Sequence, residues 1–308
     1  MKRTLISSAA VMLAASICAS GANAQSAVEK YIGDDPVEFA EVNEAVDVFK
    51  KELAAKNVPG LAKLLGLNPD EIGKSDGFDE RLTELKDAAA EKLQVVEDGE
   101  DGRILLLGGL VWPFPFPLVK ADGKWAFDTV AGLEEVLDRR IGENELEAID
   151  TSRNYIIAQA LYFADDWDGD GVHEFAQLLR SPEGTKDGLY WPTSSDGVES
   201  PAGEFVVEDK AVAAKDSPDG YYGYRYRVLT KQGENIAGGA YDYVINGNMI
   251  AGFALVATPA RYGETGIKSF VVSHQGKIYQ KDLGPESEAE AAKITEFNPD
   301  KSWELVGD

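Results

Sequence analysis

The spacing of apolar residues changes along the chain, and each change predicts a different kind of secondary structure. In the first part, apolar residues recur every three or four positions, which is typical of helices that bury one face. We expect a helix capped by Asp35 with Pro36 in its first turn, a short helix over residues 61–65, and another from Asp79. The buried face of the first helix would comprise Phe39, Val42, Val46, Phe49 and Leu53.

Strand patterns follow these helices. Residues 104–111 form a continuous apolar run, which predicts a buried strand. Residues 124–128 are expected to return beside it after a turn at Asp122 and Gly123. The first part of the chain is therefore predicted to combine helices with a small antiparallel sheet.

Between these strands lies the sequence WPFPFP, residues 112–117. Alternate N–H groups of a strand point to the same side, so the prolines would remove every donor along one edge. The same alternation would place the three aromatic side chains on one face. Such a strand pairs on one side only, which predicts an edge strand. A groove for a partner peptide is the alternative.

A long helical segment comes next, and the chain then ends in strands. We expect a helix over residues 131–140, an interruption at Gly142, and a longer helix capped by Asn144. Tyrosines that alternate from Tyr222 predict the first strand of a β-meander. Asn-Gly at 246–247 and Gln-Gly at 275–276 predict hairpins, because glycine and asparagine tolerate positive φ.

The order of these patterns predicts an α+β protein. A helical N-terminal part with a small curved antiparallel sheet would precede a long helix packed on a C-terminal antiparallel β-meander. The expected organisation is a signal peptide over residues 1–24, an N-terminal α+β domain over 25–142, and a C-terminal domain over 143–308. The C-terminal domain would hold the long helix, an acidic loop and the sheet.

The first residues predict export. Two basic residues precede an apolar run rich in alanine and serine, and Ala22 and Ala24 are the small residues that a signal peptidase requires. We expect cleavage after Ala24, a periplasmic or secreted location, and no membrane insertion of the mature chain, since the run is short for a permanent anchor. A lipoprotein signal at Cys18 is the alternative, although Ile17 stands where such signals have a small residue.

The chain is strongly acidic, with 54 Asp and Glu against 30 Lys and Arg and a net charge of −24. Such a surface repels phosphate backbones and anionic lipids, so nucleic acid and membrane surfaces are poor partners. An unknown envelope protein or a glycan remains as the expected partner. Cys18 is the single cysteine and lies within the signal peptide, so the mature chain would have neither a disulfide nor a thiolate site.

The stretch ADDWDGDGVHEFAQLL, residues 164–179, is the strongest candidate for chemistry. Counted from its second aspartate, carboxylates fall at positions 1, 3, 5 and 9, with a glycine at 6 and a backbone carbonyl at 7. This order of oxygen atoms is typical of calcium loops and predicts a structural calcium site. The predicted ligands are Asp166, Asp168, Asp170, the carbonyl of Val172, and Glu174.

Position 12 of this loop departs from the calcium-binding pattern of the EF-hand. Gln177 stands where that pattern has a bidentate glutamate. Either Glu174 closes the site or the affinity is low, and we expect a dissociation constant on the order of 10⁻⁴ to 10⁻³ M. The alternative is an Asp/Gly turn whose carboxylates all face water.

Motifs for catalysis are absent from the sequence. Neither His173 nor His274 lies near a nucleophile motif, and the chain has no metalloprotease motif and no phosphate-binding glycine loop. We therefore expect no catalytic residues, no cofactor besides calcium, and a binding or envelope-accessory role. A hydrolase acting on cell-wall or glycan material is the alternative. A sugar-stacking surface would use Tyr190, Trp191, Tyr222, Tyr224, Tyr241 and Tyr243, although aromatic residues that alternate in strands usually pack against the core.

Several motifs resemble an exported bacterial family, the domain of unknown function 2950. They are WPFPFPLVK, GKWAFDT, RRIGENELEAI, DGLYWP, YDYVINGNMIAGFALVATPARYG and GIKSFVVSHQGKIYQKDLG. The family has no established activity, so this resemblance implies export without implying chemistry. At the level of fold, the first part is similar to a nuclear-transport-factor-like cone. The second part is similar to the globular heads of type IV pilin-like proteins, some of which bind calcium, although the apolar pilin helix is missing here.

Overall fold

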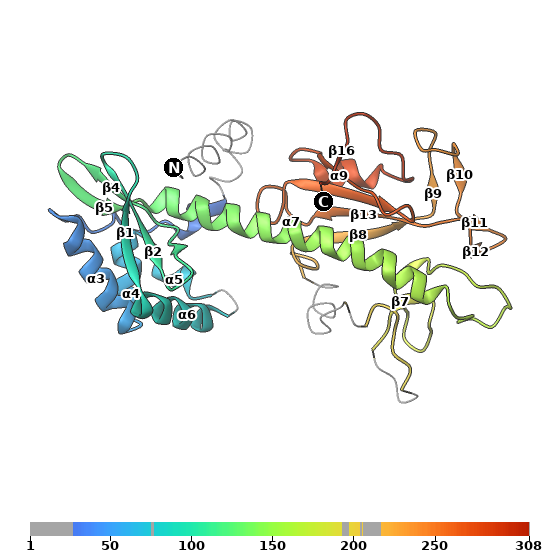
Figure 1. Ribbon diagram of the computed structural model, residues 1–308, viewed down its shortest axis with the longest axis horizontal. Coiled ribbons are helices and arrows are strands. Elements are labelled where there is room, and N and C mark those ends of the chain that lie inside the picture. The colour runs from blue at the N-terminus through green and yellow to red at the C-terminus, as the bar shows by residue number, and fades with distance from the viewer. Residues whose placement is uncertain (1–26, 75–76, 193–196, 204, 206–216, 308) are drawn as a thin grey trace, which may run out of the picture. The chain divides into compact units, whose positions relative to one another are not determined.

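The computed structural model describes residues 27–74, 77–192, 197–203, 205 and 217–307. The predicted signal peptide lies outside these described residues. The chain divides into two compact units, Met1–Arg139 and Arg140–Asp308 (Figure 1).

Helices come first in the N-terminal unit, but the first long helix begins later than predicted. It starts at Val42 behind a reciprocal capping box of Glu41 and Glu44, not at Asp35. Phe39 instead exchanges two backbone hydrogen bonds of 2.8 Å with Trp125. This pairing with a distant strand holds the segment extended. The helical elements are η1 Glu29–Tyr31, α3 Val42–Ala54, α4 Val58–Leu65, α5 Pro69–Ile72 and α6 Phe78–Glu91.

An antiparallel sheet completes the N-terminal unit. Four of its strands are hydrogen-bonded in the order β1-β2-β4-β5. The fifth, β3, pairs with β2. The strand predicted to return beside residues 104–111 pairs instead with β4, and that hairpin turns at Asp122 and Gly123. The strands are β1 Leu93–Glu97, β2 Gly102–Leu107, β3 Trp112–Pro113, β4 Leu118–Ala121 and β5 Lys124–Phe127.

The predicted edge strand over WPFPFP is only two residues long. Trp112 and Pro113 pair with β2, and the chain then bends. Phe114 and Phe116 are 5% and 6% exposed, whereas Trp112 is 43% exposed, so the prediction of three aromatic side chains on one face is wrong. The reason is packing, since the Phe114 ring lies 4.8 Å from that of Phe49 and turns into the core.

One long helix, α7 Thr129–Tyr162, continues from the first unit into the second. The predicted interruption at Gly142 is wrong. A glycine costs a helix interior about 1 kcal/mol relative to alanine, and the buried residues that follow it, such as Ala148 and Tyr155, outweigh that cost. Within the described residues, none of the helices has both the length and the hydrophobicity that crossing a membrane requires.

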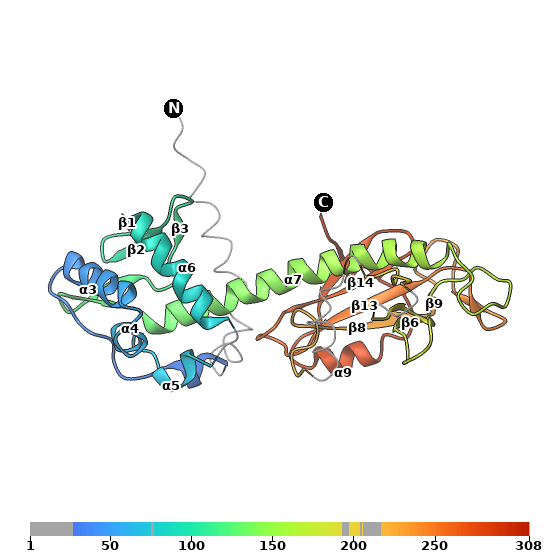
Figure 2. The same ribbon diagram turned by 90° about the horizontal axis from the view of Figure 1, so that it is seen from below.

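The C-terminal unit is built on a five-stranded antiparallel sheet with the order β16-β15-β14-β13-β8. Helix α7 covers one face and the short helix α9 the other (Figure 2). The Tyr155 hydroxyl donates to Ala254 O at 3.2 Å on the first face. On the second face, Arg227 Nη2 donates to the carbonyls of Ala291 and Ile294, both at 2.8 Å. The elements are β8 Tyr224–Leu229, β13 Ala254–Pro259, β14 Lys268–Ser273, β15 Ile278–Asp282, α9 Ser287–Ala292 and β16 Glu304–Leu305.

Three pairs of short strands surround this sheet. The predicted Asn-Gly hairpin joins β11 to β12, and Asn246 and Gly247 have φ values of 56° and 101°. The predicted hairpin at Gln275 and Gly276 joins β14 to β15. The α+β fold class, with a long helix before an antiparallel sheet, is therefore confirmed. The short strands are β6 Leu178–Arg180, β7 Gly188–Tyr190, β9 Lys231–Gln232, β10 Tyr241–Asp242, β11 Val244–Ile245 and β12 Asn248–Met249.

Candidate functional site

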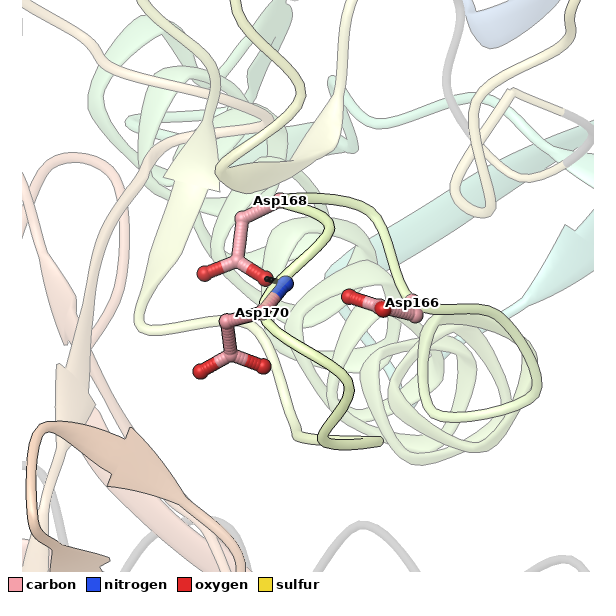
Figure 3. A group of neighbouring side chains, drawn as sticks. All are labelled: Asp166, Asp168 and Asp170. Carbon is pink, nitrogen blue, oxygen red and sulfur yellow. Dashed lines mark hydrogen bonds between the residues drawn. The ribbon is translucent and has the colours of Figure 1, made fainter.

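The acidic loop follows the end of α7 and brings three predicted ligands together. Carboxylate oxygens of Asp166, Asp168 and Asp170 all lie within 4.8 Å of one another, and the three side chains are exposed. Figure 3 shows Asp166 directed toward the turn that carries the other two. Gly169 and Gly171 have φ values of 77° and 85°, a conformation that residues with a Cβ adopt rarely. The glycines therefore allow the chain to fold the aspartates into one cluster.

Backbone N–H groups of the loop hold these carboxylates. Asp166 accepts from Gly169 N at 2.8 Å and from Gly171 N at 2.9 Å, and these bonds, chiefly that of Gly171, lower its pKa. Asp168 Oδ1 accepts from Asp170 N at 3.2 Å. Each carboxylate oxygen has two lone pairs, so one N–H bond leaves capacity for a cation.

Glu174 makes a different contact from the clustered aspartates. Its Oε2 accepts from Met249 N at 2.9 Å in β12. Burial raises the pKa of Glu174, and the negative charges of Asp168 and Asp170 raise it further, against the effect of the Met249 bond. Ligation of an ion by Glu174 and by the Val172 carbonyl stays a prediction.

The β11–β12 hairpin lies against the acidic loop. Asn248 Nδ2 donates to Asp170 Oδ2 at 2.6 Å, and Gln177 Nε2 donates to Gly247 O at 2.7 Å. Gln177 is at position 12 of the loop, where an EF-hand has its bidentate ligand, and its side chain therefore binds the hairpin. Sequence spacing predicted the hairpin and the loop separately, but it carries no signal for a contact between residues more than 60 positions apart.

Comparison with known families decides what this chain is related to. A family model matches residues 37–306. The chain belongs to the family Protein of unknown function (DUF2950). Membership confirms the resemblance of the sequence motifs and leaves the activity open. The comparisons with curated proteins and with solved structures found no match for this DUF2950 chain, so the pilin-like and nuclear-transport-factor-like resemblances stay predictions.

A buried glutamine on α7 anchors the end of the acidic loop in the DUF2950 chain. Gln159 is 0% exposed, and its Nε2 donates to Ala176 O at 2.8 Å and to the Tyr155 hydroxyl at 3.0 Å. Its Oε1 accepts from Ala176 N at 2.8 Å. The sequence prediction missed this residue. The available signal was an uncharged polar side chain on the core-facing side of a helix, between Tyr155 and Tyr162.

Four of the six aromatic residues suggested as a sugar-stacking surface are buried in the DUF2950 chain. Tyr224 and Tyr243 are 0% exposed, Trp191 is 5% exposed and Tyr190 is 7% exposed, so these side chains belong to the core. The packed-face interpretation is correct for them. Trp167, which was not part of the suggested set, lies in the acidic loop and packs on Trp191 with ring centroids 5.0 Å apart.

Proposed function

We propose that this protein is an exported binding or envelope-accessory module whose acidic loop holds calcium in a structural role. The observation that supports calcium best is the gathering of three carboxylates within 4.8 Å. Like charges at this separation repel, and a divalent cation among them turns that repulsion into attraction. Burial is the main cause of the raised pKa of Glu174, and the negative charges of Asp168 and Asp170 add to it.

The chemistry of the ligands favours calcium over softer metals. Asp166, Asp168 and Asp170 offer only oxygen atoms, which suit hard cations such as calcium and magnesium. Calcium accepts six to eight oxygens in a flexible arrangement, so an exposed loop can complete its shell with carbonyls and water. Magnesium requires a nearly regular octahedron of shorter bonds, which a surface loop of this kind supplies less readily.

The structural role follows from what the loop joins. Asp170 bonds to Asn248, and Glu174 bonds to Met249, so both ends of the β12 strand contact the loop. An ion that fixes the carboxylates would fix the β11–β12 hairpin with them. The proposed export rests on residues 1–24, and the proposed partner is an envelope protein or a glycan.

The direct test is a calcium titration of the mature chain in which the amide NMR signals of Gly169 and Gly171 are measured. Both N–H groups bond to Asp166, so ion binding should shift them in a saturable way. We expect a dissociation constant on the order of 10⁻⁴ to 10⁻³ M. Asp168→Asn should weaken binding about tenfold or more, equivalent to about 1.4 kcal/mol.

Asp150→Asn is the matched control, because Asp150 pairs with Arg153 on α7 and lies outside the cluster. It should leave the titration unchanged. Two outcomes would contradict the proposal. One is that the NMR signals of Gly169 and Gly171 do not shift at millimolar calcium, and the other is that Asp168→Asn binds calcium as tightly as the unsubstituted chain.

A further inference from the structure

The C-terminal unit contains a cavity of about 500 Å³ that none of the predicted calcium ligands lines. It is bounded by α7, the β6–β7 pair and β8, together with β13. This volume lies within the range of about 300 to 1,000 Å³ that is typical of small-molecule sites. Its wall is largely apolar and includes Tyr155, Leu179, Leu189, Tyr190, Tyr226 and Leu255.

Polar groups on this wall are few, and most of them already have polar neighbours. The hydroxyls of Tyr155 and Tyr224 already donate to backbone carbonyls, those of Ala254 and Lys268. The buried Tyr226 hydroxyl forms no hydrogen bond of normal geometry with any described residue. Thr151 is its polar neighbour and lines the same cavity. Besides the Tyr226–Thr151 pair, the wall therefore offers a ligand few hydrogen-bonding groups.

The charge of the lining differs in sign from the charge of the protein. Arg180 and Arg225 line the cavity, and none of its described lining residues is an aspartate or glutamate. The whole chain, in contrast, has 54 acidic against 30 basic residues. The Arg180 guanidinium lies 5.9 Å from the centroid of the Tyr190 ring, which forms part of the wall. A cationic rim beside an apolar interior is complementary to an anion with an apolar body.

We propose that this cavity binds a small carboxylate amphiphile, with its acyl body among the tyrosine and leucine side chains and its carboxylate against Arg180. A volume of 500 Å³ equals the liquid volume of about 17 waters at roughly 30 Å³ each. A medium-chain fatty acid has a comparable number of non-hydrogen atoms. A glycan fits less well, because a sugar needs many hydrogen-bonding groups that this wall does not offer. The inference concerns a second site and stands whether or not the acidic loop binds calcium.

The test compares two probes with the same chain and opposite head groups, dodecanoate and dodecyltrimethylammonium. Each is titrated below its micelle concentration into the mature protein in a calorimeter. We expect saturable binding of dodecanoate, at least tenfold tighter than that of the cation. Arg180→Gln should weaken dodecanoate about tenfold and remove the preference between the probes. Arg153→Gln, an exposed α7 arginine outside the cavity lining, should change neither affinity.

Two further variants separate the cavity from the outer surface. Thr151→Trp adds a large side chain to the lining and should abolish binding of both probes, with circular dichroism as the check on folding. Tyr226→Phe removes only a hydroxyl that has almost no accessible surface, and it should change the affinity for dodecanoate by less than about twofold. No saturable binding by the folded protein, equal affinity for the two probes, or full binding in a folded Thr151→Trp variant would overturn the proposal.

Discussion

Replacing Gln159 with leucine is expected to lower the free energy of unfolding of the C-terminal unit by roughly 3 kcal/mol. The substitution leaves the N–H and C=O groups of Ala176 without their partner, and Ala176 is 1% exposed. Each unsatisfied buried group costs about 1 to 3 kcal/mol. Leucine has nearly the volume of glutamine, so a cavity contributes little to the loss.

The measurement is urea unfolding, read together with hydrogen exchange at the Ala176 amide. The exchange rate of this amide should rise strongly in Gln159→Leu, because its acceptor is gone. Gln177→Leu is the matched control, since it is the same substitution at a partly exposed residue whose side chain donates to Gly247 O. That variant should lose about 1 kcal/mol. Equal losses in the two variants would show that Gln159 does not anchor the loop.

Calcium is expected to raise the free energy of unfolding by about 2.7 kcal/mol when its free concentration is 100 times the dissociation constant. The gain follows from mass action alone, because the unfolded chain does not hold the three aspartates together. For a unit of the size of Arg140–Asp308, a gain of this size corresponds to a rise in melting temperature of roughly 5 to 10 °C.

Differential scanning calorimetry of the mature chain measures this rise, with calcium and with a chelator. The control is sodium chloride at matched ionic strength, because so acidic a chain is stabilised by any salt that screens its self-repulsion. Asp168→Asn, which binds calcium about tenfold more weakly, should keep only about 1.4 kcal/mol of this gain at the same calcium concentration. A melting temperature that rises no further in calcium than in sodium chloride would contradict a structural calcium site.

The elements that sequence patterns predicted correctly depend on residues close together in the chain. The Asn246-Gly247 hairpin needs only positive φ at two adjacent positions. The aspartates at 166, 168 and 170 cluster because the glycines between them allow one tight turn. Alternation of apolar residues likewise predicted the C-terminal strands. In these cases the interactions that decide the conformation act between residues a few positions apart in the chain.

Where sequence patterns were wrong or silent, contacts between distant segments decided the outcome. Phe39 is extended because it pairs with Trp125, although its own neighbours predict a helix. Gly142 stays helical because burial on α7 exceeds its local cost of about 1 kcal/mol.

By itself, the sequence determined the α+β class, the family, the long acidic loop and the hairpins, because these follow from local spacing and composition. Only the tertiary structure decided that Gln159 anchors Ala176, that Glu174 bonds to Met249, and that a cavity with Arg180 on its rim lies beside α7. The physical reason is that these arrangements join residues 17 or more positions apart along the chain. Their energies depend on packing that no local pattern encodes.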